Sequence, residues 1–255
     1  MANYYFLIAS FPALTVGKAP ELTFKELESL LALNLTAGDM KKVRELLRPI
    51  DLYNIRAFWL GWPLDDRSSM KAKELEEALL VQEGLPSYVI EYLGRYESVA
   101  ERLRYFSSLY VSMYQDAISR DQGFLLQYFQ FERELHLVLT ALRAKQSGKN
   151  LARELQFEDP TDPLVVEILA QKDAPDFTPP REYEEVKTLF FEYLAKPNEL
   201  HQAILEYKFE KIEEMEEPQD FGIDRVLAFV AKFLIVESIS LLSQEKGREQ
   251  MRAYE

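Results

Sequence analysis

The sequence predicts an all-α protein built as a bundle of several amphipathic helices. Glycine is scarce, with 9 among 255 residues, and long stretches are rich in Ala, Leu, Glu, Lys, Gln and Arg, which favour helix. Two capping boxes, Thr23–Glu26 and Ser98–Glu101, mark helix starts, and apolar residues recur behind each at spacings of three and four. Because 47% of the residues are hydrophobic, these helices can bury a substantial core.

Helix signals separated by proline and glycine fill the first part of the chain. Pro49 is expected to stop the second helix, because proline cannot continue one. Residues 3–12 stay open between an extended segment and a helix, since Tyr4–Ile8 are β-formers and Pro12 blocks a continuing helix. Helices are expected to begin at Thr23, Asp39 and Asp51, and three more are expected at Met70–Glu83, from Ser98 to Ile118, and at Phe124–Gln146.

Prolines gather between Phe157 and Pro180, where only a short helix at Leu164–Gln171 is expected. This Pro-rich connection (157–180) separates a predicted N-terminal helical part (1–156) from a C-terminal helical part (181–255) that packs on the first. One continuous domain is the alternative. After the connection, helices are expected at Glu182–Leu194, Asn198–Glu214 and Asp224–Gln244.

The acidic, cysteine-free composition bounds the possible partners. A net charge of −13 argues against an extended nucleic-acid interface, because each phosphate contact needs a Lys or Arg. Without cysteine, disulfides, thiolate metal sites and a cysteine nucleophile are excluded. The apolar stretch Val226–Leu242 carries Lys232 and Glu237, each costing roughly 2.5 kcal/mol or more at a bilayer centre, so a buried core helix is expected there. The apolar N-terminus has no basic region before it, and we interpret it as mature protein rather than a signal peptide.

The residues that most resemble functional sites have structural interpretations. His136 and His201 lie in separate amphipathic helices without a second His or Cys at metal spacing, so neither predicts a metal site. Asp65 and Asp66 begin like the Asp-Asp-x-x-Asp diphosphate-binding motif of all-α terpenoid synthases, but the final carboxylate is missing and we interpret the pair as a turn. Four acids at one helix end are interpreted as a solvated terminus: Glu213, Glu214, Glu216 and Glu217.

No motif for catalysis or cofactor binding occurs in the chain. Phosphate loops, dinucleotide fingerprints, nucleophile elbows and His-Glu-x-x-His are all missing. We therefore predict no catalytic, cofactor-binding or metal-binding residues and no cofactor. An aromatic series that could line a ligand pocket is more typical of packing between two long helices: Tyr105, Phe106, Tyr110, Tyr114, Phe124, Tyr128, Phe129 and Phe131.

Three segments carry a family resemblance that covers most of the chain. They are Asp51–Leu60, which contains Asp-x-x-Asn-Ile-Arg, Phe131–Lys145, which ends in Leu-Arg-Ala-Lys, and Phe221–Glu237, an apolar run with a Lys and then a Glu. Together they resemble the family of V-type ATPase central-stalk proteins that form the socket on the rotor ring. The opening Tyr4–Pro12 is more similar to the short bacterial relatives encoded with V-type ATPase genes.

The resemblance implies a non-catalytic central-stalk component that links the membrane rotor ring to the shaft of the soluble head. It implies pseudo-repeated helical units, a cytoplasmic location, and contact with the membrane only through the complex. The expected partners are other components of the V-type ATPase, the rotor ring and the central shaft, and nucleic acid is not among them. Two alternatives remain: a free-standing helical protein–protein adaptor, and an all-α enzyme with an aromatic pocket that uses Asp65 and Asp66.

Overall fold

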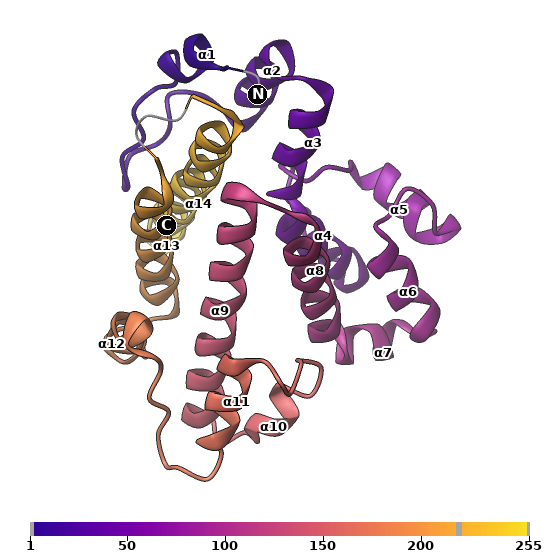
Figure 1. The fold of residues 1–255 in the computed structure, drawn as a ribbon, viewed down its shortest axis with the longest axis vertical. Helices are drawn as coiled ribbons and strands as arrows, with labels where there is room; N and C mark the ends of the chain where they lie inside the picture. Colours follow the sequence, from indigo (N-terminus) through magenta and orange to yellow (C-terminus); the bar gives the residue numbers. More distant parts are fainter. Residues whose placement is uncertain (1–2, 218–220, 254–255) are drawn as a thin grey trace. The chain divides into compact units, whose positions relative to one another are not determined.

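The computed structural model describes residues 3–217 and 221–253, with side chains as far as Leu242. Within these ranges the regular structure consists of fourteen α-helices and one short 3-10 helix, without a strand (Figure 1). The all-α prediction is confirmed. The chain forms two compact units, which we call unit 1 (Met1–Leu35 and Phe131–Glu255) and unit 2 (Thr36–Gln130).

Unit 2 is a helical cluster in which α4 and α6 both pack on α8. Its buried side chains include Leu52 of α4, Val89 of α6, and Leu109 and Met113 of α8. The helices are α3 (Ala37–Glu45), α4 (Arg48–Leu60), α5 (Ala72–Val81), α6 (Ser87–Arg95), α7 (Val99–Arg104), α8 (Phe106–Arg120) and the start of α9 (Gly123–Gln146).

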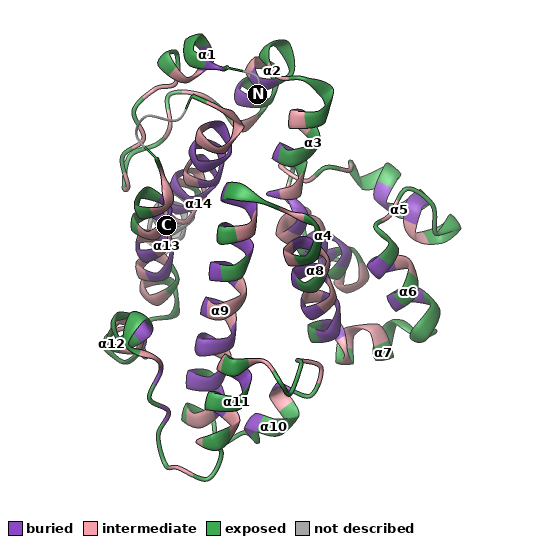
Figure 2. Ribbon diagram, in the orientation of Figure 1, coloured by how far each residue is buried: buried purple, intermediate pink, exposed green. Residues whose placement is uncertain are grey.

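Unit 1 contains the rest of α9 and a pair of long helices, α13 and α14, that pack along each other (Figure 1). Each of these helices carries a buried stripe (Figure 2), as expected for apolar residues at a 3.6-residue period. The unit consists of α1 (Tyr5–Ala9), α2 (Phe24–Asn34), the rest of α9, α10 (Leu151–Glu154), α11 (Pro163–Ala170), η1 (Arg181–Tyr183), α12 (Glu184–Glu192), α13 (Pro197–Met215) and α14 (Ile223–Ala253).

Several local features differ from the sequence expectation. Residues 3–12 contain the one-turn helix α1, so the extended alternative is wrong. Pro49 does not stop a helix but lies in the first turn of α4, where its missing N–H costs nothing. The helix expected from Ser98 to Ile118 is interrupted at Tyr105, and α6 lies where no helix was expected.

The Pro-rich connection lies inside unit 1, so the compact units divide the chain at places other than the predicted division into 1–156, 157–180 and 181–255. Two side chains of α9 hold this connection. Arg133 pairs with Glu158 and Asp162, both at 2.8 Å. The Lys145 ammonium donates to the carbonyls of Gln171, Lys172 and Ala174 at the end of α11. Proline richness here marks an irregular segment packed on a helix.

The apolar stretch of α14 is part of the unit 1 core, with Val226, Val230 and Phe233 fully buried. Its two charged residues have specific partners: Lys232 pairs with Glu216 of the α13 end, and Glu237 accepts from the Phe24 N–H of α2 at 3.3 Å. Across the described residues, no helix is long and apolar enough to cross a membrane.

The predicted capping box at Thr23 is confirmed, since the Glu26 N–H donates to the Thr23 hydroxyl and the Thr23 N–H donates to the Glu26 carboxylate. Thr23→Ala is therefore expected to destabilise unit 1 by about 1 kcal/mol. Urea unfolding followed by circular dichroism measures this loss. Ser29→Ala, which removes an exposed hydroxyl within the same helix that bonds only the Lys25 carbonyl, is the control, and an equal loss for both variants would contradict the capping role.

Candidate functional site

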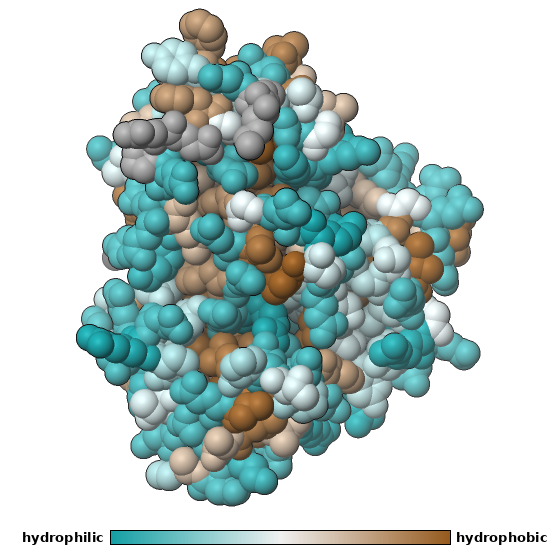
Figure 3. All heavy atoms as spheres, in the orientation of Figure 1, coloured by the Kyte–Doolittle hydropathy of each residue, from teal (hydrophilic) through white to brown (hydrophobic). Residues whose placement is uncertain are grey.

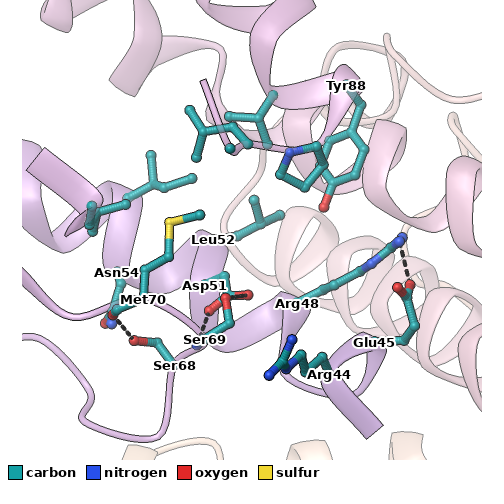
Figure 4. Close-up of a pocket in the computed structure, with 16 residues that line it drawn as sticks. Arg44, Glu45, Arg48, Asp51, Leu52, Asn54, Ser68, Ser69, Met70 and Tyr88 are labelled. Atoms are coloured by element: carbon teal, nitrogen blue, oxygen red, sulfur yellow. Dashed lines mark hydrogen bonds and ion pairs between the residues drawn. The ribbon is translucent and has the colours of Figure 1, made fainter. Parts of the chain in front are cut away.

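A pocket of about 270 Å³ lies in unit 2, between α4, the loop that follows it, α5 and α6 (Figure 4). One wall is apolar and the other carries charged and hydroxyl groups from α4 and the loop. The apolar wall consists of Leu52, Ile55, Met70, Leu75, Leu85, Pro86 and Val89. A pocket of this volume lies just below the range of about 300–1,000 Å³ that holds small-molecule ligands, and it suits one or two side chains.

Asp51 and Asn54, one turn apart on α4, fix the loop that forms one side of the pocket. The Ser69 N–H and hydroxyl both donate to Asp51, each at 2.8 Å. Asn54 exchanges two hydrogen bonds with the Asp65 backbone, at 2.8 and 2.9 Å. Burial raises the pKa of Asp51, and the two bonds from Ser69 oppose that rise. The Asp-x-x-Asn pattern therefore acts as a clamp on the loop.

Arg48 forms the charged corner of the pocket, and its charge is already neutralised. Its guanidinium pairs with Glu45 of α3 and with Asp116 of α8, the second at 2.8 Å. The same group lies over the Tyr88 ring, 5.9 Å from the centroid. Because both carboxylates come from neighbouring helices, Arg48 joins α3, α4 and α8 and leaves little charge for a ligand.

Two polar groups at the pocket remain available. The Tyr88 side chain is only 7% exposed, and its hydroxyl has no hydrogen-bond partner among the described residues. Figure 4 shows this hydroxyl directed into the hollow, toward the Arg48 side chain. Burial raises the pKa of Tyr88 well above its usual range, so the group stays a donor. Arg44, at the rim, likewise has no side-chain partner in the described part of the chain.

This combination of groups is suited to binding. Buried polar groups are almost always hydrogen-bonded, so an unpaired hydroxyl facing a hollow indicates a place for an acceptor from outside the chain. Arg44 adds a cation at the rim, and the apolar wall can cover a hydrocarbon side chain. The pocket therefore favours an apolar group that carries a carbonyl or carboxylate beside it.

The acids singled out from sequence lie elsewhere. Asp65 pairs with Arg67 at 2.6 Å in the loop after α4, and neither it nor Asp66 lines the pocket. Burial tends to raise the pKa of Asp65, but its hydrogen bonds from Arg67 outweigh burial and lower it. The pair forms part of a turn in this loop, as interpreted from sequence. No group of three or more His, Cys, Asp or Glu among the described residues could hold a metal ion.

The predicted aromatic series belongs largely to helix packing. Phe106 packs edge-on against Trp59 and Tyr92, and Phe124, Tyr128, Phe129 and Phe131 are buried. Sequence reasoning missed Tyr88 and Arg44. Tyr88 lies on α6, which the sequence did not predict, and Arg44 looks like any exposed cation until its neighbours are known.

The two histidines lie in unit 1, on α9 and α13. Burial lowers the pKa of His136 to about 4, and the nearby Arg143 lowers it further. Burial likewise lowers the pKa of His201. Both imidazoles are thus held in the neutral form by their surroundings.

His136 is expected to make unit 1 less stable in acid. Its folded pKa of about 4 lies below the unfolded value near 6.5, so the unfolded chain binds the extra proton in this window. Stability then falls as pH drops from 6.5 to 4, by up to about 1.4 kcal/mol per pH unit. Urea unfolding across this range should give a shallower slope for His136→Gln than for wild type, and parallel slopes would contradict the prediction.

The fold and the pocket together define an all-α protein with a small binding pocket, and the comparisons place it in a family. A family model described as "Protein of unknown function (DUF2764)" matches residues 1–254, and the chain belongs to that family. Among its relatives are uncharacterized proteins of Chlamydia muridarum, 33% identical over 99% of this chain and 98% of the relative, and of Chlamydia trachomatis, 31% identical over the same shares. A Chlamydia pneumoniae protein is 30% identical over 98% of this chain and 96% of its own length. No solved structure matches the chain.

The resemblance to the V-type ATPase central-stalk family and its short bacterial relatives is therefore wrong as a family assignment. The family model spans nearly the whole chain, whereas the resemblance rested on patterns of helix and charge. Those patterns have local causes in this fold: Asp51 and Asn54 clamp a loop, and Lys232 and Glu237 serve the packing of α14.

Proposed function

We propose that this protein is a non-catalytic helical adaptor that binds another protein, and that the unit 2 pocket receives a side chain of that partner. The observation that carries the proposal is the buried, unpaired Tyr88 hydroxyl facing a hollow with an apolar wall. The partner segment would insert an apolar side chain between α4, α5 and α6. A carbonyl or carboxylate of that segment would accept from Tyr88 or Arg44.

Several features favour binding over catalysis at this pocket. Arg48 is neutralised by two carboxylates, and Asp51 is engaged by the loop it clamps. These groups already maintain the shape of the pocket, so they are poorly placed to exchange protons with a substrate. The enzyme alternative based on Asp65 and Asp66 lacks support, because neither carboxylate lines the pocket.

The proposal is tested by comparing what co-purifies with the tagged protein and with the variant Arg44→Ser/Tyr88→Phe. The variant loses one cation and one hydroxyl, neither of which has a partner among the described residues, so it should fold normally. Loss of two such contacts is expected to deplete a specific partner about tenfold or more. Lys73→Ser, which replaces an exposed lysine of α5 that does not line the pocket, should retain the partner.

Equal recovery of the same proteins with all three forms would contradict a binding role for the pocket. A stable fold is checked by the melting temperature, which should agree for wild type, the pocket variant and Lys73→Ser. A large drop for the pocket variant alone would show instead that Tyr88 and Arg44 serve packing.

The particular assembly predicted from sequence, the central stalk of a V-type rotary ATPase, stays a prediction. Two properties that it drew on do not depend on the family assignment: the all-helical body and the net charge of −13. In such an assembly the protein would be cytoplasmic and would reach the membrane through its partners. Purification of a complete V-type complex without this chain, from cells that express it, would contradict the stalk role and leave the adaptor proposal intact.

A further inference from the structure

Three aromatic rings form an exposed patch in unit 1, which we call the aromatic patch: Tyr5, Phe6 and Phe221. Phe6 is 87% exposed, the largest value among the bulky hydrophobic side chains that are described. The Tyr5 ring joins the patch, with its centroid 5.6 Å from that of Phe6 and 5.1 Å from that of Phe221. Figure 3 shows apolar side chains protruding over α1 and α2. Contiguous exposed rings are typical of interaction surfaces.

The aromatic patch is anchored to the body of unit 1. The Tyr4 N–H donates to the Phe221 carbonyl at 2.8 Å, which ties α1 to the start of α14. Tyr4 and Leu7, which flank the exposed pair, are both buried. Further along, the Phe11 ring stacks on Phe229 with centroids 3.9 Å apart. The rings are therefore presented by a segment that is already folded, so a partner need not order it.

Carboxylates border this segment. Ile8 of α1 lines a hollow of about 310 Å³ together with Glu213 and Glu216, so the end of α13 lies beside α1. The two cations of that hollow, Arg225 and Lys232, both pair with Glu216. Glu213 is largely exposed and lies 3.7 Å from Lys232. The carbonyl end of α13 adds a partial negative charge at the same place.

An unpaired acid completes this border. Glu217 follows α13, is exposed, and has no side-chain partner among the described residues. Glu214 pairs only with Lys211 of its own helix, at 2.8 Å. The solvated helix terminus expected from sequence is thus also an acidic rim beside exposed rings.

We infer that the aromatic patch docks a basic amphipathic helix of a partner protein. Its apolar side chains would cover Phe6 and Phe221, and its lysines or arginines would meet Glu213 and Glu217. A cation can also lie over the Tyr5 ring. A second copy of this acidic chain and an anionic lipid surface would both be repelled by the rim. This surface is separate from the unit 2 pocket and goes beyond the function proposed for it.

The probe is a fluorescent amphipathic helical peptide built from Leu and Lys, with a matched peptide that has Glu in place of Lys. Fluorescence anisotropy should detect binding of the Lys peptide and not of the Glu peptide. Phe6→Ser is expected to weaken binding about tenfold, as for a central hydrophobic contact. Glu213→Gln/Glu217→Gln should also weaken it and reduce its dependence on salt.

Leu80→Ser is the matched control, because Leu80 is similarly exposed and lies in unit 2. Its affinity for the Lys peptide should equal that of wild type. Failure of the Lys peptide to bind, equal binding of the Glu peptide, or unchanged affinity in Phe6→Ser would overturn the inference. So would binding to phosphatidylcholine vesicles, or dimerisation in sedimentation, that disappears in Phe6→Ser.

Discussion

Leu234→Asp is expected to destabilise unit 1 by several kcal/mol. Leu234 lies on the buried face of α14 and is 9% exposed, in a helix whose neighbours Phe233 and Ile235 are also buried. The new carboxylate would be removed from water without a cation placed to receive it, and the hydrocarbon contact would be lost as well. Thermal unfolding followed by circular dichroism should show a fall in Tm of about 10 °C or more.

Leu241→Asp is the matched control for that experiment. Leu241 lies on the same helix but is 46% exposed, so its replacement should change the free energy of unfolding by about 0.5 kcal/mol or less. An unchanged Tm in Leu234→Asp would contradict the burial of this face and would indicate that it is free for an interface.

Glu216→Ala should have an effect of similar size, by a different mechanism. Glu216 pairs with both Arg225 and Lys232, and the side chains of Glu216 and Lys232 are 9% and 13% exposed. Removal of the shared carboxylate leaves Lys232 buried beside Phe209 with only the distant, exposed Glu213 near it. Breaking a buried pair in this way costs about 3–5 kcal/mol.

The ion-pair mechanism makes a further requirement that plain packing does not. In the double variant Glu216→Ala/Lys232→Met, much of the lost stability should return, because no uncompensated buried charge remains. Glu217→Ala, one residue along and exposed, should leave urea unfolding unchanged. If the double variant were less stable than Glu216→Ala, the pair would not be the source of the loss.

Most helices of this fold could be predicted because their signals are local. The capping boxes at Thr23 and Ser98 and the periodic apolar residues of α9 and α13 act within a few residues of each helix. What failed depends on the fold. α6 begins at Pro86 without a side-chain cap, and the kink at Tyr105 separates α7 from α8 without a glycine or proline. Neither has a strong signal in a single sequence.

The candidate site could not be predicted because it depends on those missed features. Tyr88 lies on α6, and its hydroxyl indicates a binding site only when it is buried without a partner. Asp51 and Asn54 were noticed as a motif, but their role as a clamp requires the return of Ser69 and Asp65 to α4. The same motif suggested a different family, because a short helical pattern of Asp and Asn specifies a packing device rather than a lineage.

Photocrosslinking from inside the pocket, in living cells, tests the central claim most directly. A benzoylphenylalanine in place of Leu85, which lines the pocket, is compared with one in place of Leu80, which is exposed outside it. We predict a discrete protein adduct from position 85, weakened by Tyr88→Phe and missing from position 80. The same adducts from both positions, or none from position 85, would contradict a docking role for the pocket.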